Sequence, residues 1–300
     1  MQGNAPNGVS QWWASQPMGV RALFLVNVSV YVGGLVVPPS WSLSARNAPG
    51  NLCMQSALVV AHPEQSYRIF TSAFTHGGLM HIGFNMVTFL GTGPSLERAL
   101  GTLRFTQLVL LLVAVLGVLY VLVAFTAQLF GYSKFMGECA VGFSGVIFAL
   151  ITIEALAAPP DRVITLWGMQ IPARWYPVAM LAFTQFIMPN VSFIGHFVGI
   201  LGGYAFATRL LDVALLSAAA AAWAEGLFPL SKLARSPSWV PAPAEPPPAP
   251  LLGRFTARLR GCLSALSSWR GHPGGAPGGA EGDVEFGVPR PGDLPGEGFP

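Results

Sequence analysis

Residues 108–125 read LVLLLVAVLGVLYVLVAF, a run of apolar residues with no charged side chain. A run of roughly eighteen or more such residues predicts a transmembrane helix, because it is long enough to cross the hydrocarbon core of a bilayer. The whole chain has the same character, since 52% of its residues are hydrophobic and only 10% are charged, against about a quarter charged in an average soluble protein. This composition argues against a soluble enzyme and predicts a membrane domain with several spans.

Charge and proline are unevenly distributed along the 300 residues. Residues 1–230 hold 16 charged side chains, and the last 70 residues hold the other 13 together with half of the 26 prolines. This split predicts a hydrophobic body followed by a polar tail rich in Pro and Gly. The net charge of +3 is small and scattered, so no nucleic acid is expected as a partner. The 3 cysteines are too few for a disulfide scaffold and lack the C-x-x-C spacing of a metal site, so no metal is expected. No cofactor is predicted either.

Six apolar segments predict an all-α, polytopic membrane protein with a bundle of six transmembrane helices. The segments fall at about 19–37, 77–95, 104–128, 141–158, 175–189 and 193–211, and a long loop at 38–76 separates the first two. If the N-terminus is cytosolic, six arginines lie on the cytosolic side of the spans and three basic residues on the other, which supports this orientation. Both termini are then cytosolic, because the number of spans is even.

The predicted organisation has four parts. They are an N-terminal cytosolic segment at 1–18, a six-helix domain at 19–212, an interfacial or extended helix at 213–230 and a disordered cytosolic tail at 231–300. The first part contains no Lys or Arg and no long apolar core, which argues against a cleaved signal or transit peptide. The Ala-rich residues 213–228 are the alternative place for a seventh span, but Asp212 and Glu225 at their edges favour an interfacial helix.

Residues 251–270 carry Leu and Phe at helical spacing with arginines between them. This pattern is typical of a short basic amphipathic helix that lies on the membrane or docks a cytosolic partner, and a weakly helical linker fits it equally well. The Gly/Pro-rich residues 271–300 that follow are predicted to be disordered.

Polar side chains within the spans are few, and burying them in lipid is expensive, so each is a candidate for function. THGGLMHIGFN at residues 75–85 places His81 and Asn85 four residues apart, on one face of a helix. AVGFSG at residues 140–145 contains Ser144, and GHFVGILGG at residues 195–203 contains His196. All three clusters fall near the non-cytosolic ends of their spans and therefore share one depth.

A serine and a histidine on touching helices can act as a nucleophile and its general base. Small residues make such contact feasible: Gly195, Gly199 and Gly203 recur every four residues in span six, and Gly145 with Ala149 gives span four the same spacing. Backbone N–H groups at the positive end of a helix that begins at the serine would form an oxyanion hole together with the histidine and asparagine of span two.

Each of these residues also has a plain structural alternative. A serine in a transmembrane helix usually bonds to the preceding turn, a His–Asn pair can join two helices, and small residues at four-residue spacing are common in membranes. The combination, in order and at one depth, favours a catalytic site. Glu154 lies ten residues after Ser144, nearly three helical turns away, so the prediction is a Ser–His dyad without a carboxylate.

The order and spelling of these motifs resemble the rhomboid family of intramembrane serine proteases over about residues 10–212. The resemblance rests on GFSG, on the histidine before GxxGG in span six and on HxxxN in span two. It implies that Ser144 is the nucleophile and His196 the general base. It further implies that His81, Asn85 and the Ser144 amide form the oxyanion site, and that Gly142 shapes the loop.

The resemblance also implies two structural elements. Tyr67 and Arg68 resemble the aromatic–Arg pair of the family's first loop, and Glu97 with Gly101 matches its ExxxG turn. Ala99 stands where many members have Arg, and the neighbouring Arg98 is expected to substitute for it. Three stretches, QWWASQP at 11–17, MGECAVGFSG at 136–145 and NVSFIGHFVGILGG at 190–203, resemble plant-type rhomboid-like proteins of the ubiquitin-associated-domain-containing subgroup. No such domain is visible in residues 271–300, so a link to ubiquitin is an analogy.

The resemblance implies an intramembrane serine endopeptidase that cleaves peptide bonds in or near transmembrane segments of other proteins, in an endomembrane such as the ER or Golgi. The alternative is a non-proteolytic, derlin-like adaptor that binds and escorts membrane-protein clients. A third interpretation, a transporter, needs charged or broken helices at mid-membrane, and only Glu154 approaches that description.

Three positions on the predicted lumenal side remain to be interpreted. A disulfide between Cys53 and Cys139 requires an oxidising compartment, and two free, half-buried thiols are the simpler interpretation. Asn190 begins an N-V-S glycosylation sequon, but it abuts the bilayer and is expected to stay unmodified.

Overall fold

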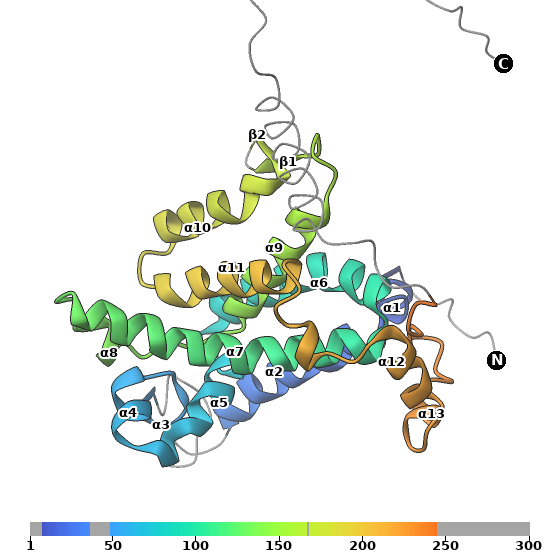
Figure 1. Ribbon diagram of the computed structural model, residues 1–300, viewed down its shortest axis with the longest axis horizontal. Coiled ribbons are helices and arrows are strands. Elements are labelled where there is room, and N and C mark those ends of the chain that lie inside the picture. The colour runs from blue at the N-terminus through green and yellow to red at the C-terminus, as the bar shows by residue number, and fades with distance from the viewer. Residues whose placement is uncertain (1–7, 37–48, 167, 245–300) are drawn as a thin grey trace, which may run out of the picture. The chain divides into compact units, whose positions relative to one another are not determined.

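The computed structural model describes residues 8–36, 49–166 and 168–244, and nearly all of its regular structure is helical (Figure 1). A principal helix lies in each of the six predicted spans: α2 (Met18–Val36), α6 (Leu79–Leu100), α7 (Thr102–Leu129), α9 (Ser144–Ala157), α10 (Tyr176–Ile187) and α11 (Phe193–Ala207). A short helix, α1 (Gly8–Ala14), precedes them. The predicted amphipathic segment 251–270 lies outside the described residues.

Two of the described helices, α2 and α7, are long and apolar enough to cross a membrane by themselves. A third crossing results if α11 and the segment Asp212–Glu225 count as one span with an 80° bend. The helix α9 is apolar but has only 14 residues. The described chain is therefore a helical membrane protein, and the number of six spans stays a prediction.

Short helices, which the sequence interpretation did not contain, fill most of the described part of the predicted loop 38–76. These are α3 (Pro49–Leu52), α4 (Ser56–Ala61), the 3-10 helix η1 (Pro63–Tyr67) and α5 (Arg68–Phe74). In Figure 1 they gather on the side of α7 toward its C-terminal end, where α8 (Lys134–Gly137) follows. No run of hydrophobic periodicity marks these helices, because most of them are only one or two turns long.

Between α9 and α10 the chain forms an antiparallel hairpin that the sequence interpretation did not contain. Its strands are β1 (Val163–Leu166) and β2 (Met169–Pro172), with Val163 opposite Pro172 and Leu166 opposite Met169. The turn contains Gly168 with φ of +83°, a conformation that favours glycine. The β-branched residues of β1 fit a strand, but four residues are too few for a clear periodic signal.

The single helix predicted at 213–230 is wrong in its extent. The segment contains the 3-10 helix η3 (Asp212–Ala214), then α12 (Ala218–Glu225) and α13 (Leu230–Leu233). Ser217 starts α12 by capping it, since its hydroxyl accepts a hydrogen bond from the Ala220 N–H at 3.1 Å. Pro229 lies just before α13 and lacks the N–H that a continuous helix would use.

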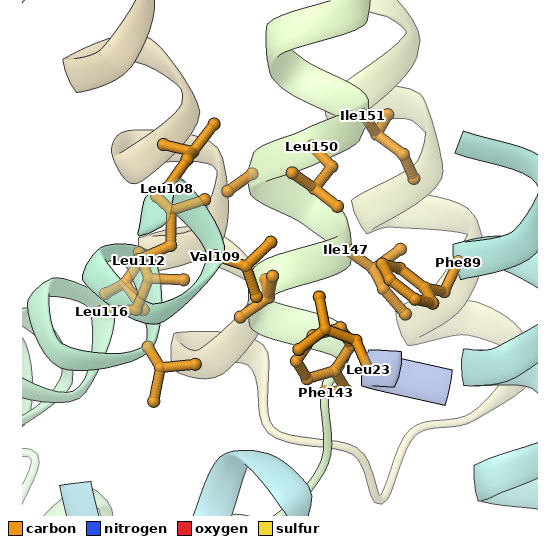
Figure 2. Packing of buried hydrophobic residues seen from close by; sticks show 14 of the residues in the cluster. Leu23, Phe89, Leu108, Val109, Leu112, Leu116, Phe143, Ile147, Leu150 and Ile151 are labelled. Atoms are coloured by element: carbon orange, nitrogen blue, oxygen red, sulfur yellow. The ribbon is translucent and has the colours of Figure 1, made fainter. Parts of the chain in front are cut away.

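The core surrounds α7, which packs against α5, α6, α9 and α11. Leu108 and Leu112, one turn apart on α7, are fully buried in one cluster with Leu150 of α9 and Phe143 (Figure 2). In lipid there is little hydrophobic gain from joining two helices, so close packing and interhelical hydrogen bonds hold the bundle together. The position of the helix α9 therefore depends on how closely its neighbours approach.

The helices α9 and α11 approach each other along the predicted small residues. A Cβ atom built on Gly199 would lie 2.3 Å from the Gly145 carbonyl oxygen, and one built on Gly203 would lie 2.7 Å from the Ala149 carbonyl oxygen. On the other helix, a Cβ atom on Gly145 would lie 3.1 Å from the Gly195 carbonyl oxygen. A larger side chain at Gly199 or Gly203 cannot fit without separating the two helices.

A buried carboxylate near the C-terminal end of α6 joins α6 to α2 and α7. Glu97 is fully buried and accepts hydrogen bonds from the N–H groups of Gly19 (2.8 Å) and Val20 (2.7 Å) and from the Thr102 hydroxyl (2.5 Å). Arg98 donates to the Ser15 carbonyl at 3.3 Å. Arg98 was expected to substitute for the family's arginine, but the hydrogen bond it forms is to Ser15. Backbone N–H groups and a hydroxyl bind the Glu97 carboxylate instead.

The predicted boundary of the tail at residue 231 is too early. The Met18 N–H donates to the Ser238 carbonyl at 2.7 Å, and Thr102 and Val240 exchange two hydrogen bonds, of 2.8 and 2.9 Å. Gly101, with φ of +85°, leaves room for this segment, because a Cβ atom there would lie 2.8 Å from Cα of Ala242. The chain therefore stays attached to the helical domain as far as Ala242.

Candidate active site

Ser144 is the first residue of α9 and follows a tight turn at Gly142, whose φ is +118°. Its Oγ lies 2.9 Å from Nε2 of His196, which is 3% exposed on the facing helix α11. The close approach of Gly145 to the Gly195 carbonyl, next to the two side chains, permits this distance. The structure thus brings the two residues of the predicted dyad into hydrogen-bonding contact.

The ring of His196 is held by stacking. It lies against the ring of Phe148, one turn after Ser144 on α9, with centroids 4.5 Å apart and an angle of 24° between the planes. Its Nδ1 is buried and has no hydrogen-bond partner among the described residues. Glu154, the remote carboxylate, accepts a hydrogen bond from Ser95 instead. Ser144 and His196 thus form a pair without a carboxylate, and the ring of Phe148 supports the imidazole.

His81, on the first turns of α6, lies directly against the turn before Ser144. A Cβ atom on Gly142 would be 2.6 Å from Nε2 of His81, so only glycine fits there. Nδ1 of His81 accepts a long hydrogen bond, 3.4 Å, from the Gly77 N–H. A neutral imidazole that accepts at Nδ1 carries its proton on Nε2, so this atom can donate toward the site.

Asn85 does not reach the cavity beside Ser144, in contrast to the predicted oxyanion role. It is 4% exposed, and its Nδ2 donates to the His81 carbonyl at 2.8 Å, one turn back on its own helix. The predicted structural alternative, a bond between helices, is not what the amide forms either. In this structure Asn85 supports the first turns of α6.

His76 is a buried residue that the sequence interpretation left without a role. Its Nε2 accepts a long hydrogen bond, 3.5 Å, from the N–H of Phe143, and its ring meets that of His81 edge to face with centroids 5.2 Å apart. The residue precedes the first turn of α6, so helical spacing could not connect it with His81. The THGG sequence around it was the available signal.

A cavity of about 210 Å³ opens beside Ser144 and His196. Its wall also contains a polar cluster that sequence reasoning missed: Tyr120 donates to Oε2 of Glu138 at 3.1 Å, and its hydroxyl lies 3.2 Å from Oγ of Ser192. These three residues come from distant parts of the chain, so no local pattern connects them. Among the described residues, no three His, Cys, Asp or Glu side chains lie close enough to hold a metal ion.

The loop before Ser144 is attached to the segment between α2 and α6 that contains the short helices α3 to α5. Cys139 forms a disulfide with Cys53, where the sequence interpretation favoured free thiols, and Met54 and Ala140 exchange backbone hydrogen bonds of 2.8 and 2.9 Å. The Gly142 N–H donates to the Ser72 carbonyl at 2.9 Å. Because residues 138–142 of this loop line the cavity, the short helices α3 to α5 help to fix the shape of the site.

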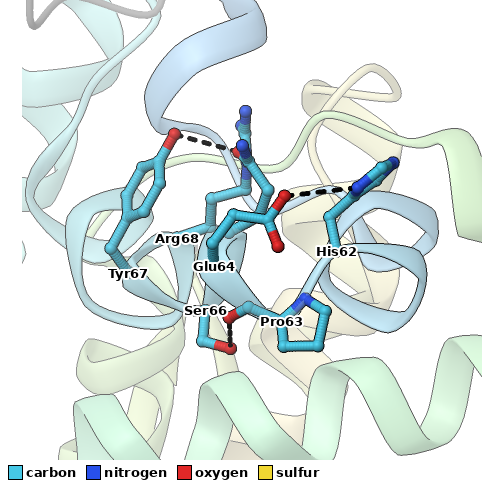
Figure 3. A network of polar contacts seen from close by, with 7 residues as sticks. His62, Pro63, Glu64, Ser66, Tyr67 and Arg68 are labelled. Carbon is cyan, nitrogen blue, oxygen red and sulfur yellow. Dashed lines mark hydrogen bonds and ion pairs between the residues drawn. The ribbon is translucent and has the colours of Figure 1, made fainter.

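Arg68 holds the segment around Cys53 in place. It is 3% exposed, and its guanidinium donates to the Cys53 carbonyl at 2.9 Å and to Gln65 at 2.8 Å. Figure 3 shows Tyr67 beside Arg68 in this network, and the exposed pair of His62 and Glu64, 3.3 Å apart, next to it. The predicted aromatic–Arg pair therefore serves the loop and not the cavity.

The helical domain matches a known protein family. The model of the Rhomboid domain matches residues 63–213, which include every described residue that lines the cavity except Met54. The chain belongs to the rhomboid family. This rhomboid is 30% identical to Rhomboid-like protein 15 of Arabidopsis thaliana over 237 residues, which are 77% of this chain and 56% of that protein.

Two further relatives extend the comparison. Rhomboid-related protein 4 of Mus musculus is 39% identical over 137 residues, 45% of this chain and 43% of that protein. Rhomboid-type serine protease 2 of Neurospora crassa is 27% identical over 192 residues, 63% of this chain and 65% of that protein. The chain spans about half the length of the first two relatives, and only the third of these names includes a protease.

Proposed function

We propose that this rhomboid is an intramembrane serine endopeptidase. The observation that carries the proposal is the 2.9 Å contact between Ser144 Oγ and His196 Nε2 on the wall of a cavity. A hydroxyl that hydrogen-bonds to a neutral imidazole can lose its proton as it attacks a carbonyl carbon. The name of the fungal relative supports the same reaction class.

The reaction has two halves. In the first, Ser144 Oγ bonds to the carbonyl carbon of the scissile peptide while His196 Nε2 takes its proton, and the proton then passes to the leaving amine as the C–N bond breaks. In the second, water attacks the acyl-enzyme, with His196 again taking and returning a proton. The products are a new carboxyl end and a new amino end.

The negative oxygen of each tetrahedral intermediate needs hydrogen-bond donors. The Ser144 N–H at the start of α9 and Nε2 of His81 are the donors that the arrangement supports, and Gly142 leaves space between them. Asn85 takes part through His81, because its amide donates to the His81 carbonyl at 2.8 Å and supports the turn of α6 that carries the imidazole.

The substrates are transmembrane segments of other proteins. A peptide bond within a helix is shielded by its neighbours, and in lipid its polar groups need internal partners, so a segment must unwind locally before Ser144 can attack it. Segments with helix-breaking residues near the bilayer surface fit this requirement. They would reach the cavity from the surrounding lipid.

The location of the protein is part of the same proposal. Six crossings with both termini in the cytosol, in an endomembrane such as the ER or Golgi, place the loop that contains Cys53 and Cys139 in the lumen. The disulfide supports this placement, because such bonds form in oxidising compartments. A cytosolic partner of residues 251–270 remains a prediction outside the described residues.

The test uses the full-length protein in liposomes with a transmembrane substrate. We expect cleavage in the wild type, loss of cleavage in Ser144→Ala and in His196→Ala, and unchanged cleavage in Ser133→Ala, a control serine on an exposed turn before α8. A serine-directed fluorophosphonate should label the wild type but not Ser144→Ala.

Cleavage that persists in Ser144→Ala would exclude the protease. If the wild type cleaves nothing, while Ser144→Ala rescues a loss-of-function phenotype in cells, the derlin-like adaptor replaces it.

A further inference from the structure

Glu138 is the one acidic side chain among the described residues that line the cavity beside Ser144, and no lysine or arginine lines it. The volume of about 210 Å³ is below the roughly 300–1,000 Å³ typical of sites for drug-sized ligands. The cavity is thus of a size for side chains of an extended peptide. A carboxylate in the cavity wall can therefore select which substrate side chains bind there.

The carboxylate is held in a fixed direction. Its Oε2 accepts a hydrogen bond from Tyr120, which is 4% exposed and whose hydroxyl also lies 3.2 Å from Ser192 Oγ. Ser192 in turn caps α11 by accepting from the Gly195 N–H, one residue before His196. The cluster thus links Glu138 to the helix that carries the general base.

The backbone next to Glu138 is equally constrained. Cys139 is covalently joined to Cys53, and Ala140 pairs with Met54 through two hydrogen bonds. The backbone that carries this carboxylate cannot move far from the cavity without breaking these contacts. Its position is therefore available to a ligand without reorganisation of the loop.

The charge of Glu138 is not compensated within the described chain. Neither of the two ion pairs found there includes it, and its Oε1 accepts no hydrogen bond from any described residue. An ionised carboxylate at the edge of a membrane domain, partly removed from water, gains more from a charge-assisted hydrogen bond than one in bulk solvent. Oε1 is therefore open to a donor from a ligand, and an ammonium or guanidinium group of a substrate is the donor that forms the strongest hydrogen bond to a carboxylate.

We propose that Glu138 is a specificity-determining residue that selects transmembrane segments with a Lys or Arg side chain beside the scissile bond. The inference rests on the proposed function, because it names the substrate class of the same cavity. The ammonium or guanidinium group pairs with Oε1 while Tyr120 holds Oε2. The methylene groups of the same side chain pack against Val113 and Leu116, which also line the cavity.

The experiment uses the full-length protein in liposomes and three transmembrane peptides that differ at one residue beside the scissile bond, which is Lys, Met or Glu. For each peptide, kcat/KM is measured with the wild type, and equilibrium binding is measured with Ser144→Ala. We expect the Lys peptide to be preferred over the Met peptide about tenfold in both measurements, and the Glu peptide to be worst. Added salt should reduce the preference.

Three variants assign the preference to the carboxylate. Glu138→Gln keeps an acceptor for Tyr120 but removes the charge, so the Lys/Met ratio should fall to about one. Glu138→Lys should favour the Glu peptide. Glu64→Gln changes an exposed carboxylate of η1, outside the cavity, and should keep the wild-type ratio. A merely structural role of Glu138 would change all three peptides alike.

The outcomes separate this inference from the proposed function. Cleavage without a preference for Lys, or with a preference that survives in Glu138→Gln, overturns the inference and leaves the protease intact. Absence of cleavage, with Lys-selective binding that Glu138→Gln removes, overturns the protease and leaves the selection of basic segments. Equal binding of the three peptides overturns the inference whether or not any of them is cleaved.

Discussion

The two ends of the helix α6 each hold a polar cluster in a lipid-embedded body, and the clusters differ in how completely they are satisfied. At one end Glu97 is fully buried, and three donors from two other segments bind its oxygens. At the other end a cavity adjoins Ser144, and Nδ1 of His196 and Oε1 of Glu138 have no partner among the described residues. Burial of polar groups is common to both ends, so it does not identify a site; open hydrogen-bonding capacity next to a space does.

The sharpest test of this comparison is Ser144→Ala. We expect cleavage of a transmembrane substrate to fall at least about a thousandfold, while the free energy of unfolding changes by less than about 0.5 kcal/mol. The reason is that the hydroxyl serves the reaction and is surrounded by a cavity that tolerates its loss. Kinetics and thermal unfolding in detergent measure the two quantities on one preparation. A large loss of stability would make Ser144 a structural residue like Glu97.

The reciprocal test is Glu97→Ala. Removing the carboxylate leaves the N–H groups of Gly19 and Val20 and the Thr102 hydroxyl without their acceptor, so we expect the protein to lose about 3 kcal/mol of stability or more. The fraction that remains folded should still react with a serine-directed probe. Glu64→Ala removes an exposed carboxylate of η1 and serves as the control. Loss of probe labelling in folded Glu97→Ala would show that the two ends are coupled.

An intermediate effect is expected for Gly142→Ala. The new Cβ atom would lie 2.6 Å from Nε2 of His81 at a backbone φ of +118°, so the loop must shift. We expect stability to fall by about 1–2 kcal/mol and cleavage to fall about a hundredfold. Gly137→Ala, where a Cβ atom meets nothing within 4 Å, is the matched control. Equal effects of the two substitutions would contradict the role of the turn.

The smallest effect is expected for Thr102→Val at the Glu97 end. The substitution keeps the shape of the side chain but removes a hydroxyl that donates to Glu97 and accepts from the Val240 N–H. We expect a loss of about 1 kcal/mol and no change in kcat/KM. Thr126→Val on the same helix, whose hydroxyl only bonds back to Leu122, provides the control. Thermal unfolding of the two variants against the wild type decides the question.

Much of the arrangement could be predicted from the sequence, because lipid imposes simple rules on it. Long apolar runs located the six principal helices, and the small residues at 145, 199 and 203 occur where α9 and α11 touch. The contact between Ser144 and His196 follows from that approach. The catalytic roles of these residues stay predictions until the variants are measured.

Other features could not be read from local patterns. Tyr120, Glu138 and Ser192 meet only because the loop before α9 folds back over α7, and the attachment of residues 238–242 depends on the path of the chain after α12. Asn85 has the predicted spacing from His81, but its amide bonds within its own helix, a choice that spacing does not determine. The helices of the first loop are short and depend on the disulfide and on Arg68.

The disulfide has one more consequence, which concerns the connectivity of the chain. Cys53 and Cys139 are 86 positions apart, so the covalent bond closes a ring that contains α6, α7 and the Glu97 end between them. A ring of this length lowers the conformational entropy of the unfolded chain by an amount worth about 4–5 kcal/mol. It also means that a single cut anywhere between the two cysteines leaves one covalent molecule. The helical hairpin that carries both clusters is therefore a closed loop, fastened covalently at the cavity end and by the hydrogen bonds of Glu97 at the other.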